Sequence, residues 1–193
     1  ETRRAAAEAA MNHPARGPQP RLDADLAKRF AIKAQYLAST VESVSGRAQV
    51  PLAVARYLCE RSLPPQAVAT GDVAGFAWAG VGIEVATRVA VDADKTGISG
   101  CFCAIAETGT LLLLSGPQTP GSVSLLPETH IAIVEAARIV PFMEDAWALL
   151  RAERGSLPRA VNFVSGPSRT ADIEQTVTMG AHGPYRVHII LVG

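Results

Sequence analysis

Residues 165–184, SGPSRTADIEQTVTMGAHGP, concentrate polar and special-backbone residues between apolar runs. Ser168 and Arg169 follow the apolar run VNFV, and we expect a helix over residues 171–179 directly after them. The unpaired N–H groups at the start of a helix attract negative charge, and a guanidinium binds carboxylate or phosphate through two parallel hydrogen bonds. The segment therefore predicts a site for a small anion at the carboxyl end of a strand.

The predicted anion site draws on several residues of this segment. The ligand-binding candidates are Ser165, Gly166, Ser168, Arg169, Thr170 and Asp172. His182, near the end of the segment, is a candidate catalytic acid or base at the rim of the site. A well-capped helix is the alternative interpretation, because Thr170 is an ordinary N-cap residue and Asp172 and Glu174 can satisfy the helix dipole themselves.

A second polar turn, Glu107-Thr108-Gly109-Thr110, separates two apolar runs. Its two threonines and its glycine carry hydroxyl and backbone N–H groups that can bind the same anion. Glu107 is a candidate catalytic base or nucleophile. The alternative is a turn whose glutamate faces water. We expect this turn and residues 165–170 to meet at one edge of a sheet and to line a single pocket.

The composition excludes several classes of protein. The formal net charge of zero argues against a nucleic-acid surface, which needs an excess of Lys and Arg. Cys59, Cys101 and Cys103 are too few for a four-thiolate cluster, and no histidine pair has the spacing of a helical metal site, so no metal is expected. We also expect no membrane span and a cytoplasmic protein, because the longest apolar run is far short of about 20 residues and the start carries no secretory signal.

The N-terminal third of the chain is predicted to be mainly helical. We expect a loose arm over residues 1–20 and a single domain over residues 21–193, whose first part, residues 21–64, is helical. Apolar residues at helical spacing predict one helix over residues 23–43. A second helix is predicted over PLAVARYLCERSLP, with Pro51 in its first turn.

The remainder of the chain alternates short apolar runs with helical candidates. The runs include QAVAT, TLLLLSG, HIAIVEAARIV, VNFVSG and YRVHIILVG, and the later helical candidates cover residues 143–154 and 171–179. Runs that are apolar at nearly every position are typical of strands covered on both faces. The pattern therefore predicts an α/β domain with a largely parallel sheet flanked by helices.

Three blocks of the sequence resemble the LUD-domain family, specifically its lactate utilisation protein C group. They are GISGCFCAIAETGTLLLLS, SLLPETHIAIV and SGPSRTADIEQTVTMGAHGPYRVHIILV, and the resemblance covers residues 97–193 in detail. It implies a Rossmann-like fold similar to the sugar-phosphate isomerase and coenzyme A transferase superfamily. It also implies a place in a system that oxidises L-lactate to pyruvate, with iron–sulfur clusters on partner subunits. Members of that superfamily place a glutamate ahead of a glycine turn, and Glu107 in ETG looks similar.

Three functions remain open from the sequence. The first is an accessory subunit of the lactate-oxidising system that binds a small carboxylate or an organic cofactor between the two polar turns. The second is an independent enzyme of acyl- or phosphate-ester chemistry that uses Glu107. The third is a purely structural subunit whose polar turns only cap helices. The accessory role is favoured, and the sequence leaves the cofactor and the oligomeric state unknown.

Overall fold

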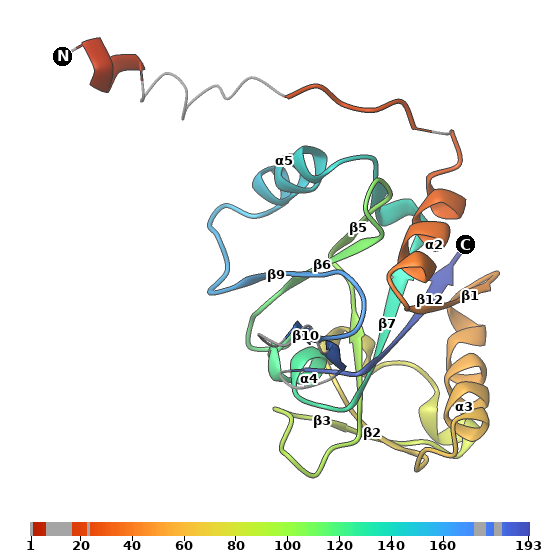
Figure 1. The fold of residues 1–193 in the computed structure, drawn as a ribbon. Helices are drawn as coiled ribbons and strands as arrows, with labels where there is room; N and C mark the ends of the chain where they lie inside the picture. Colours follow the sequence, from red (N-terminus) through yellow and green to blue (C-terminus); the bar gives the residue numbers. More distant parts are fainter. Residues whose placement is uncertain (1, 7–16, 23, 172–176, 180–182) are drawn as a thin grey trace.

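The computed structural model describes residues 2–6, 17–22, 24–171, 177–179 and 183–193. Its central element is a six-stranded sheet in the order β1-β12-β7-β4-β2-β3 (Figure 1). These strands are β1 (Thr40–Val44), β2 (Gln66–Ala69), β3 (Glu84–Thr87), β4 (Thr96–Gly100), β7 (Thr129–Glu135) and β12 (Arg186–Val192). Every neighbouring pair is parallel, which confirms the predicted α/β class with a largely parallel, Rossmann-like sheet.

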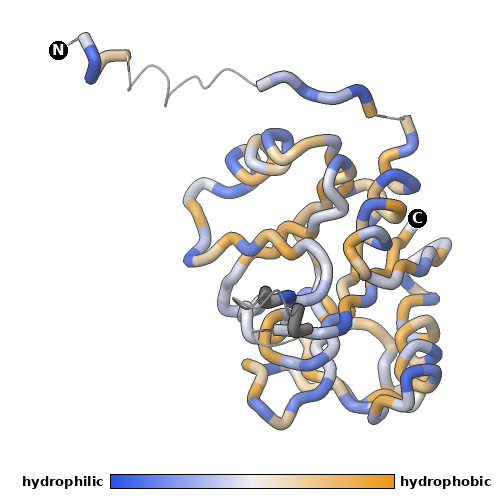
Figure 2. The backbone as a smooth tube through the Cα atoms, in the orientation of Figure 1, coloured by the Kyte–Doolittle hydropathy of each residue, from blue (hydrophilic) through white to orange (hydrophobic). Residues whose placement is uncertain are grey.

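Helices and a second sheet cover the two faces of this sheet. The helices are α2 (Leu26–Tyr36), α3 (Val50–Glu60), α4 (Ser122–Leu125) and α5 (Met143–Glu153). On one face, Val54 and Leu58 of α3 pack in one cluster with Ile98 of β4. On the other face, Phe30 of α2 packs with Val134 of β7. Figure 2 shows the resulting apolar strands in orange between more hydrophilic connections.

The second sheet has the order β8-β5-β6-β9, and the sequence did not predict it as a separate sheet. Its strands are β5 (Cys103–Ile105), β6 (Thr110–Leu114), β8 (Ile139–Val140) and β9 (Val161–Val164). Leu111 and Leu113 pack toward the main sheet, whereas Leu112 packs in a cluster with Ala146 of α5. The run of leucines is therefore covered on both faces, as its pattern indicates, but the pattern does not say which sheet the strand joins.

The predicted helix over residues 23–43 ends earlier than expected. α2 stops at Tyr36, and Ala38 takes a left-handed backbone with φ 68°. The amide of Ser39 donates to the carbonyl of Ala34 and closes the helix end. The next residues, TVESV, form β1 because threonine and valine favour strands. The second helical prediction is confirmed, with Pro51 in the first turn of α3.

The prediction of a helix over residues 171–179 is wrong. The described part of this segment forms β10 (Arg169–Ala171) and β11 (Val177–Met179), which pair antiparallel with Thr170 opposite Thr178. Threonine and valine at these positions favour extended backbone over helix. Asp172 and Glu174, which would have stood in the first turn of that helix, lie outside the described residues.

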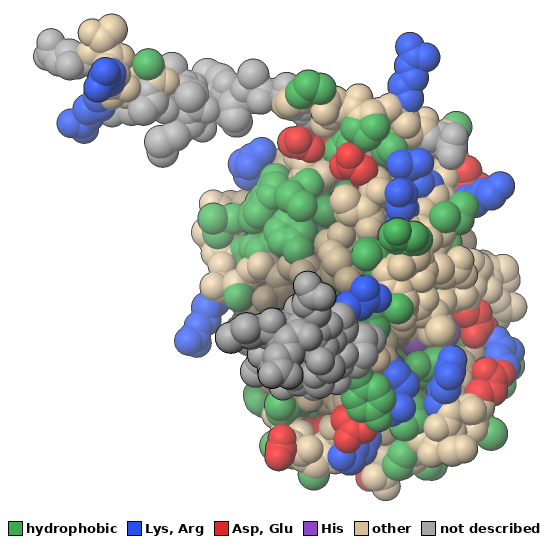
Figure 3. Space-filling model, in the orientation of Figure 1, with side chains coloured by type: hydrophobic (Ala, Val, Ile, Leu, Met, Phe, Trp, Pro, Cys, Tyr) green, Lys and Arg blue, Asp and Glu red, His purple; other side chains and the backbone are tan. Residues whose placement is uncertain are grey.

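The N-terminal arm is only partly described. Residues 17–22 have no regular secondary structure, and the side-chain amide of Gln19 donates to Glu144 of α5 at 3.4 Å. The division into an arm over residues 1–20 and one domain over residues 21–193 stays a prediction. On the face drawn in Figure 3, acidic and basic side chains are interspersed, in keeping with the formal net charge of zero.

Two histidines are buried in the main sheet, one on each face. His130 of β7 is fully buried, its Nδ1 has no partner within the part of the chain that the structure describes, and burial lowers its pKa to about 4. His188 of β12 stacks on Tyr57 at 4.0 Å between ring centroids, and its Nδ1 lies 2.8 Å from the Thr40 hydroxyl. Burial, followed by the charges of Arg61 and Arg56, lowers its pKa to about 4. Both imidazoles are therefore neutral at pH 7.

We predict that the free energy of unfolding falls as the pH drops from 7 to 5. The unfolded chain protonates these histidines near pH 6.5, whereas the folded chain resists protonation down to about pH 4. Stability is thus fully present above pH 6.5 and is lost between pH 6.5 and 4, by roughly 2–4 kcal/mol at pH 5 for the pair. Urea unfolding at each pH measures this.

Substitution of either histidine separates its contribution to the pH effect. His130→Gln and His188→Gln should each remove about half of the slope, whatever they do to stability at pH 7. A free energy of unfolding that stays constant between pH 7 and 5 in the wild type would contradict the assignment of neutral, buried imidazoles.

Candidate functional site

The two predicted polar turns meet in the structure. The hydroxyl oxygens of Thr110 and Ser165 are 2.8 Å apart, and the Thr108 hydroxyl donates to the Thr110 hydroxyl at 2.8 Å. Antiparallel pairing of β6 with β9 causes this contact, because Leu111 lies opposite Val164 and each polar residue adjoins that pair. The two bends, 55 residues apart in sequence, are therefore neighbours at one end of the second sheet.

Glycines in both turns lie against the end of helix α2. Gly109 has φ 72° and Gly166 has φ 79°, a region that side chains disfavour. A Cβ at Gly109 would lie 2.4 Å from the backbone nitrogen of Ala34, and one at Gly166 would lie 2.2 Å from the Leu37 carbonyl oxygen. The backbone of α2 and its C-cap thus fill the space in front of both glycines.

Arg169 lies against the same helix end. Its Nη2 donates to the Leu37 carbonyl oxygen at 3.2 Å, and Leu37 is the C-cap residue of α2. A cation at this position complements the negative end of a helix dipole. The sequence placed Arg169 beside a positive helix N-terminus, and that placement is wrong, because β10 begins at Arg169 itself.

The other predicted site residues are placed as follows. The amide of Ser168 donates to the Pro184 carbonyl at 2.8 Å, and Thr170 belongs to β10. Glu107 is half-buried; its amide donates to the Pro141 carbonyl at 3.1 Å, and its carboxylate has no hydrogen-bond or ion-pair partner among the described residues. Asp172 and His182 lie outside the described residues. Anion binding and catalysis by this set stay predictions.

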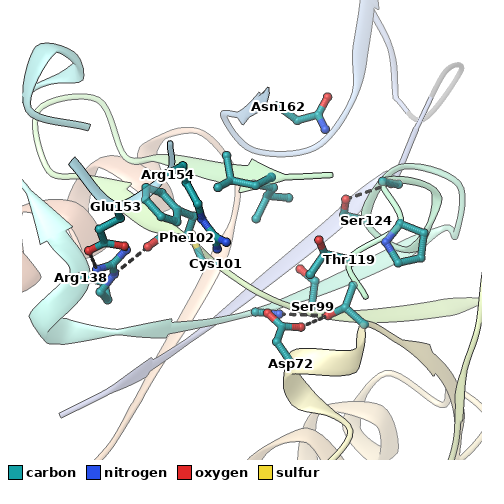
Figure 4. A pocket seen from close by; sticks show the side chains of 16 residues that line it. Asp72, Ser99, Cys101, Phe102, Thr119, Ser124, Arg138, Glu153, Arg154 and Asn162 are labelled. Atoms are coloured by element: carbon teal, nitrogen blue, oxygen red, sulfur yellow. Dashed lines mark hydrogen bonds and ion pairs between the residues drawn. The ribbon is translucent and has the colours of Figure 1, made fainter. Parts of the chain in front are cut away.

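A cavity of about 250 Å³ lies elsewhere, at the carboxyl ends of β2 and β4 (Figure 4). Thr70 and Asp72 follow β2, and Ser99 and Cys101 stand at the end of β4. The second sheet contributes Leu113, Leu114 and Asn162 to the opposite wall, and the end of α5 contributes Glu153 and Arg154. The cavity therefore lies between the two sheets.

Asp72 is held at one side of the cavity. The Thr70 hydroxyl donates to its carboxylate, and the amide of Gly100 donates to the Thr70 hydroxyl at 3.4 Å. A Cβ at Gly100 would lie 2.2 Å from the Asp72 carboxylate, so only glycine allows this approach. Ser99, at the adjoining position, is 4% exposed, and its hydroxyl lies 2.9 Å from Nε2 of His130.

A group of charged and aromatic side chains forms the other side of the cavity. Arg138 binds Glu153 through paired contacts, one of 2.9 Å, and donates from Nε to the Phe102 carbonyl at 2.8 Å. This pairing lowers the pKa of Glu153 and raises that of Arg138. The guanidinium of Arg154 lies 5.9 Å from the centre of the Phe102 ring and has no ion pair or side-chain hydrogen bond with any residue that the structure describes.

Cys101 lines the cavity, and its surroundings disfavour the thiolate form. Its thiol donates to the Cys103 carbonyl at 2.9 Å, and burial raises its pKa far above the usual range. Burial likewise raises the pKa of Cys103 to about 11. In the described part of the chain, no group of three or more His, Cys, Asp or Glu side chains could hold a metal ion. None of the helices described has the length and apolar character needed to cross a bilayer.

The family model of the LUD domain matches residues 70–192, well over half of the chain. The chain belongs to the LUD-domain family. The matched range contains both polar turns and every residue named above around the cavity. The resemblance seen in the sequence is thereby confirmed.

Individual relatives agree with this assignment. The chain is 42% identical over 101 residues to lactate utilization protein C of Bacillus subtilis, covering 51% of this chain and 42% of that protein. It is 35% identical over 139 residues to an uncharacterized protein of Neisseria meningitidis, covering 67% of this chain and 60% of that protein. The chain thus spans about half the length of the curated relatives it matches.

A solved structure confirms the fold. The crystal structure of a DUF162 family protein from Deinococcus radiodurans superposes with a TM-score of 0.66 at 26% identity. The superposition covers 90% of this chain and 100% of that chain. The mixed architecture of a parallel sheet with flanking helices is therefore shared with an experimentally solved protein.

Sequence reasoning missed the cavity residues, including Asp72, Ser99 and Arg154. None of them stands in a recognisable motif, because each comes from a different element and only the strand order brings them together. The glycines around Ser99, in GISGC, were the available signal, since glycine at a strand end often marks a close backbone approach.

Gly109→Ala and Gly166→Ala should each reduce the free energy of unfolding by at least about 2 kcal/mol. Both would force a side chain into a left-handed backbone and against the end of α2. Gly155→Ala is the matched control, because a Cβ there meets nothing within 4 Å, and it should change stability by less than about 0.5 kcal/mol. Urea unfolding compares the three; equal stability of all three would contradict the packing against α2.

Proposed function

We propose that this chain is the LUD-domain component of a system for L-lactate utilisation that oxidises L-lactate to pyruvate. The observation that carries the proposal is the 42% identity, over 101 residues, to the Bacillus subtilis protein named lactate utilization protein C. The match of the LUD family model to residues 70–192 agrees with it.

The proposal assigns iron–sulfur clusters to partner proteins. Oxidation of lactate to pyruvate releases two electrons and two protons, and an acceptor must take the electrons. This chain has three cysteines, fewer than the four thiolates that commonly hold a cluster. Burial also keeps the thiols of Cys101 and Cys103 protonated at neutral pH. The part proposed for this chain is to bind a small carboxylate or an organic cofactor.

The polar turns are a proposed contact for an anionic group of that ligand or cofactor. Thr110 and Ser165 form a hydroxyl pair, and Arg169, which is exposed, uses one guanidinium N–H on Leu37. Among the described residues no other side-chain hydrogen bond of Arg169 is seen, and a guanidinium suits a carboxylate or phosphate. Glu107 adds a carboxylate without a described partner, which suits a base or nucleophile. These properties support the proposal that the polar turns bind an anionic group.

A structural role is the second candidate for the same turns. The contact of Arg169 with the C-cap of α2, and the packing of Gly109 and Gly166 on that helix, favour it. In this case the turns hold α2 on the second sheet, and the chain serves as an assembly subunit whose ligand lies elsewhere. An Arg169 variant distinguishes the two candidates.

Arg169→Ala should weaken the binding of inorganic phosphate, used as the probe anion, by about tenfold or more, because a charge-assisted hydrogen bond is lost. The free energy of unfolding should fall by no more than about 1 kcal/mol, since the side chain is exposed. Calorimetric titration measures the first effect and urea unfolding the second. Arg159→Ala, at another exposed arginine, is the control; equal phosphate affinity in all three proteins would remove Arg169 from the site.

Deletion of the gene in its own organism tests the role in lactate utilisation. Growth with L-lactate as carbon source should be lost and growth with pyruvate kept, and a plasmid copy of the gene should restore growth on L-lactate. An affinity-tagged chain from lactate-grown cells should co-purify with proteins that carry iron–sulfur absorbance. Unimpaired growth of the deletion strain on L-lactate would contradict the proposal.

A further inference from the structure

The cavity between the two sheets occupies the position where open α/β sheets bind ligands. β2 and β4 are parallel neighbours, but the strand of the main sheet that follows β2 in the chain is β3, on one side, and the one that follows β4, after the β5–β6 hairpin and α4, is β7, on the opposite side. Connections that diverge in this way open a crevice beyond the carboxyl ends of the two strands. Thr70, Asp72 and Ser99 surround that crevice, and the second sheet closes it from above (Figure 4).

The orientation of the Ser99 hydroxyl is fixed by the buried His130. His130 is fully buried and neutral, and its Nδ1 has no hydrogen-bond partner among the described residues. An unpaired buried acceptor costs less than an unpaired buried N–H, so the favoured tautomer carries its proton on Nε2. Nε2–H then donates to the Ser99 oxygen over the observed 2.9 Å. The Ser99 proton has no other acceptor among the described residues and is available to the cavity.

Asp72 supplies an acceptor that lines the same cavity. Its carboxylate accepts from the Thr70 hydroxyl just beyond the end of β2, and Ser99 lines the cavity at the end of β4 (Figure 4). A donor and an acceptor that line one cavity suit a ligand hydroxyl placed between them, which accepts from one group and donates to the other. A ligand carboxylate is disfavoured at this side because it would lie close to the Asp72 charge.

A cation lies on the wall formed by α5. Arg138 is paired with Glu153, whereas Arg154 lies over the Phe102 ring without an ion pair or side-chain hydrogen bond to a described residue. The hydrogen bond and charge of Arg138 lower the pKa of Glu153, and the charge of Arg154 adds to this effect. The amide of Asn162 on β9 adds a neutral hydrogen-bonding group to the same cavity. This side therefore suits a carboxylate, which a guanidinium can bind through two hydrogen bonds.

We propose that this cavity binds a small hydroxylated carboxylate, with its hydroxyl group between Ser99 and Asp72 and its carboxylate at Arg154. His130 is a positioning residue that orients the Ser99 hydroxyl. The inference rests on the proposed function only for the choice of L-lactate as the first ligand to test. The site is separate from the polar turns, since Thr110, Ser165 and Arg169 do not line this cavity.

Titration of the full chain with L-lactate and with propionate, followed by ligand-observed NMR at pH 7, tests the proposal. Propionate has the same carboxylate and lacks the hydroxyl, so the wild type should bind L-lactate about tenfold more tightly. Ser99→Ala and Asp72→Asn should each reduce this preference to twofold or less while leaving propionate binding unchanged. Arg154→Ala should weaken both ligands alike by tenfold or more, and Arg151→Ala, one turn earlier on α5, should weaken neither.

Two variants of His130 separate positioning from a structural role. His130→Leu should lose the preference for L-lactate while its melting temperature stays equal or rises, because a buried polar group is removed. His130→Gln keeps an N–H donor and should restore most of the preference. Circular dichroism checks the folding of each variant. If a buried variant fails to fold, Arg154→Ala, at an exposed residue, still tests the contact with the ligand carboxylate.

The possible results separate this inference from the proposed function. No binding of L-lactate by the wild type, equal affinity for L-lactate and propionate, or a preference that survives Ser99→Ala would each overturn the cavity assignment. None of these results bears on growth of the deletion strain. Conversely, normal growth of that strain on L-lactate would remove the proposed function, while a hydroxyl preference abolished by Ser99→Ala would still support the cavity.

Discussion

The parallel pairing of β4 between β2 and β7 is the constraint on which the cavity depends. It places Ile98 opposite both Ala69 and Ile131, and so fixes the face of the sheet to which each neighbour points. Gly97 and Ser99 then share the face that α4 covers. A Cβ at Gly97 would lie 1.9 Å from the Val123 carbonyl oxygen, so glycine lets α4 approach the sheet closely enough to wall the cavity.

A one-residue slip of β4 would remove the arrangement around Ser99. Successive side chains of a strand point to opposite faces, so a slip would turn Ser99 toward α3 and would bring Ile98 to the cavity. The apolar cluster on the α3 side, which contains Ile98 and Ile131, makes that slip costly. The hydrophobic core on one face therefore maintains the polar site on the other.

The second sheet converts an open sheet edge into an enclosed cavity. β5 continues directly from the end of β4, and β6 returns antiparallel through the Glu107–Thr110 turn. This hairpin brings Leu113 over the cavity and leaves its turn against α2. The Glu107–Thr110 turn thus holds the second sheet against α2. Helix α5 packs on the outer side of the same sheet and brings Arg154 to the cavity.

Much of the fold could be predicted from the sequence, because apolar runs report burial directly. The parallel sheet, α3 with Pro51, and α5 follow from periodicity and from helix-boundary residues. The segment 171–179 could not be predicted in the same way, since its spacing fits a helix while its threonines and valine favour the observed hairpin. The sequence predicted that the two polar turns meet at one edge of a sheet. It did not predict the hydroxyl contact between Thr110 and Ser165 or the packing of both turns against α2.

The cavity residues were beyond sequence reasoning for a different reason. Asp72, Ser99 and Arg154 are ordinary residues at the ends of three elements, and they meet only because of the order of strands in the sheet. Strand order is set by long-range packing, which no local pattern encodes. His130 resembled any histidine at the start of a strand, and its importance follows only from the 2.9 Å contact with Ser99.

Amide chemical-shift mapping of the full chain with L-lactate tests the central claim most directly. The claim is that the ligand enters between the two sheets, at the carboxyl ends of β2 and β4. It predicts that the largest shifts occur at the backbone amides of Gly100, Cys101 and Gly121 and at the side-chain amide of Asn162. Shifts confined to residues 107–110 and 165–169, or no shifts at saturating L-lactate, would contradict it.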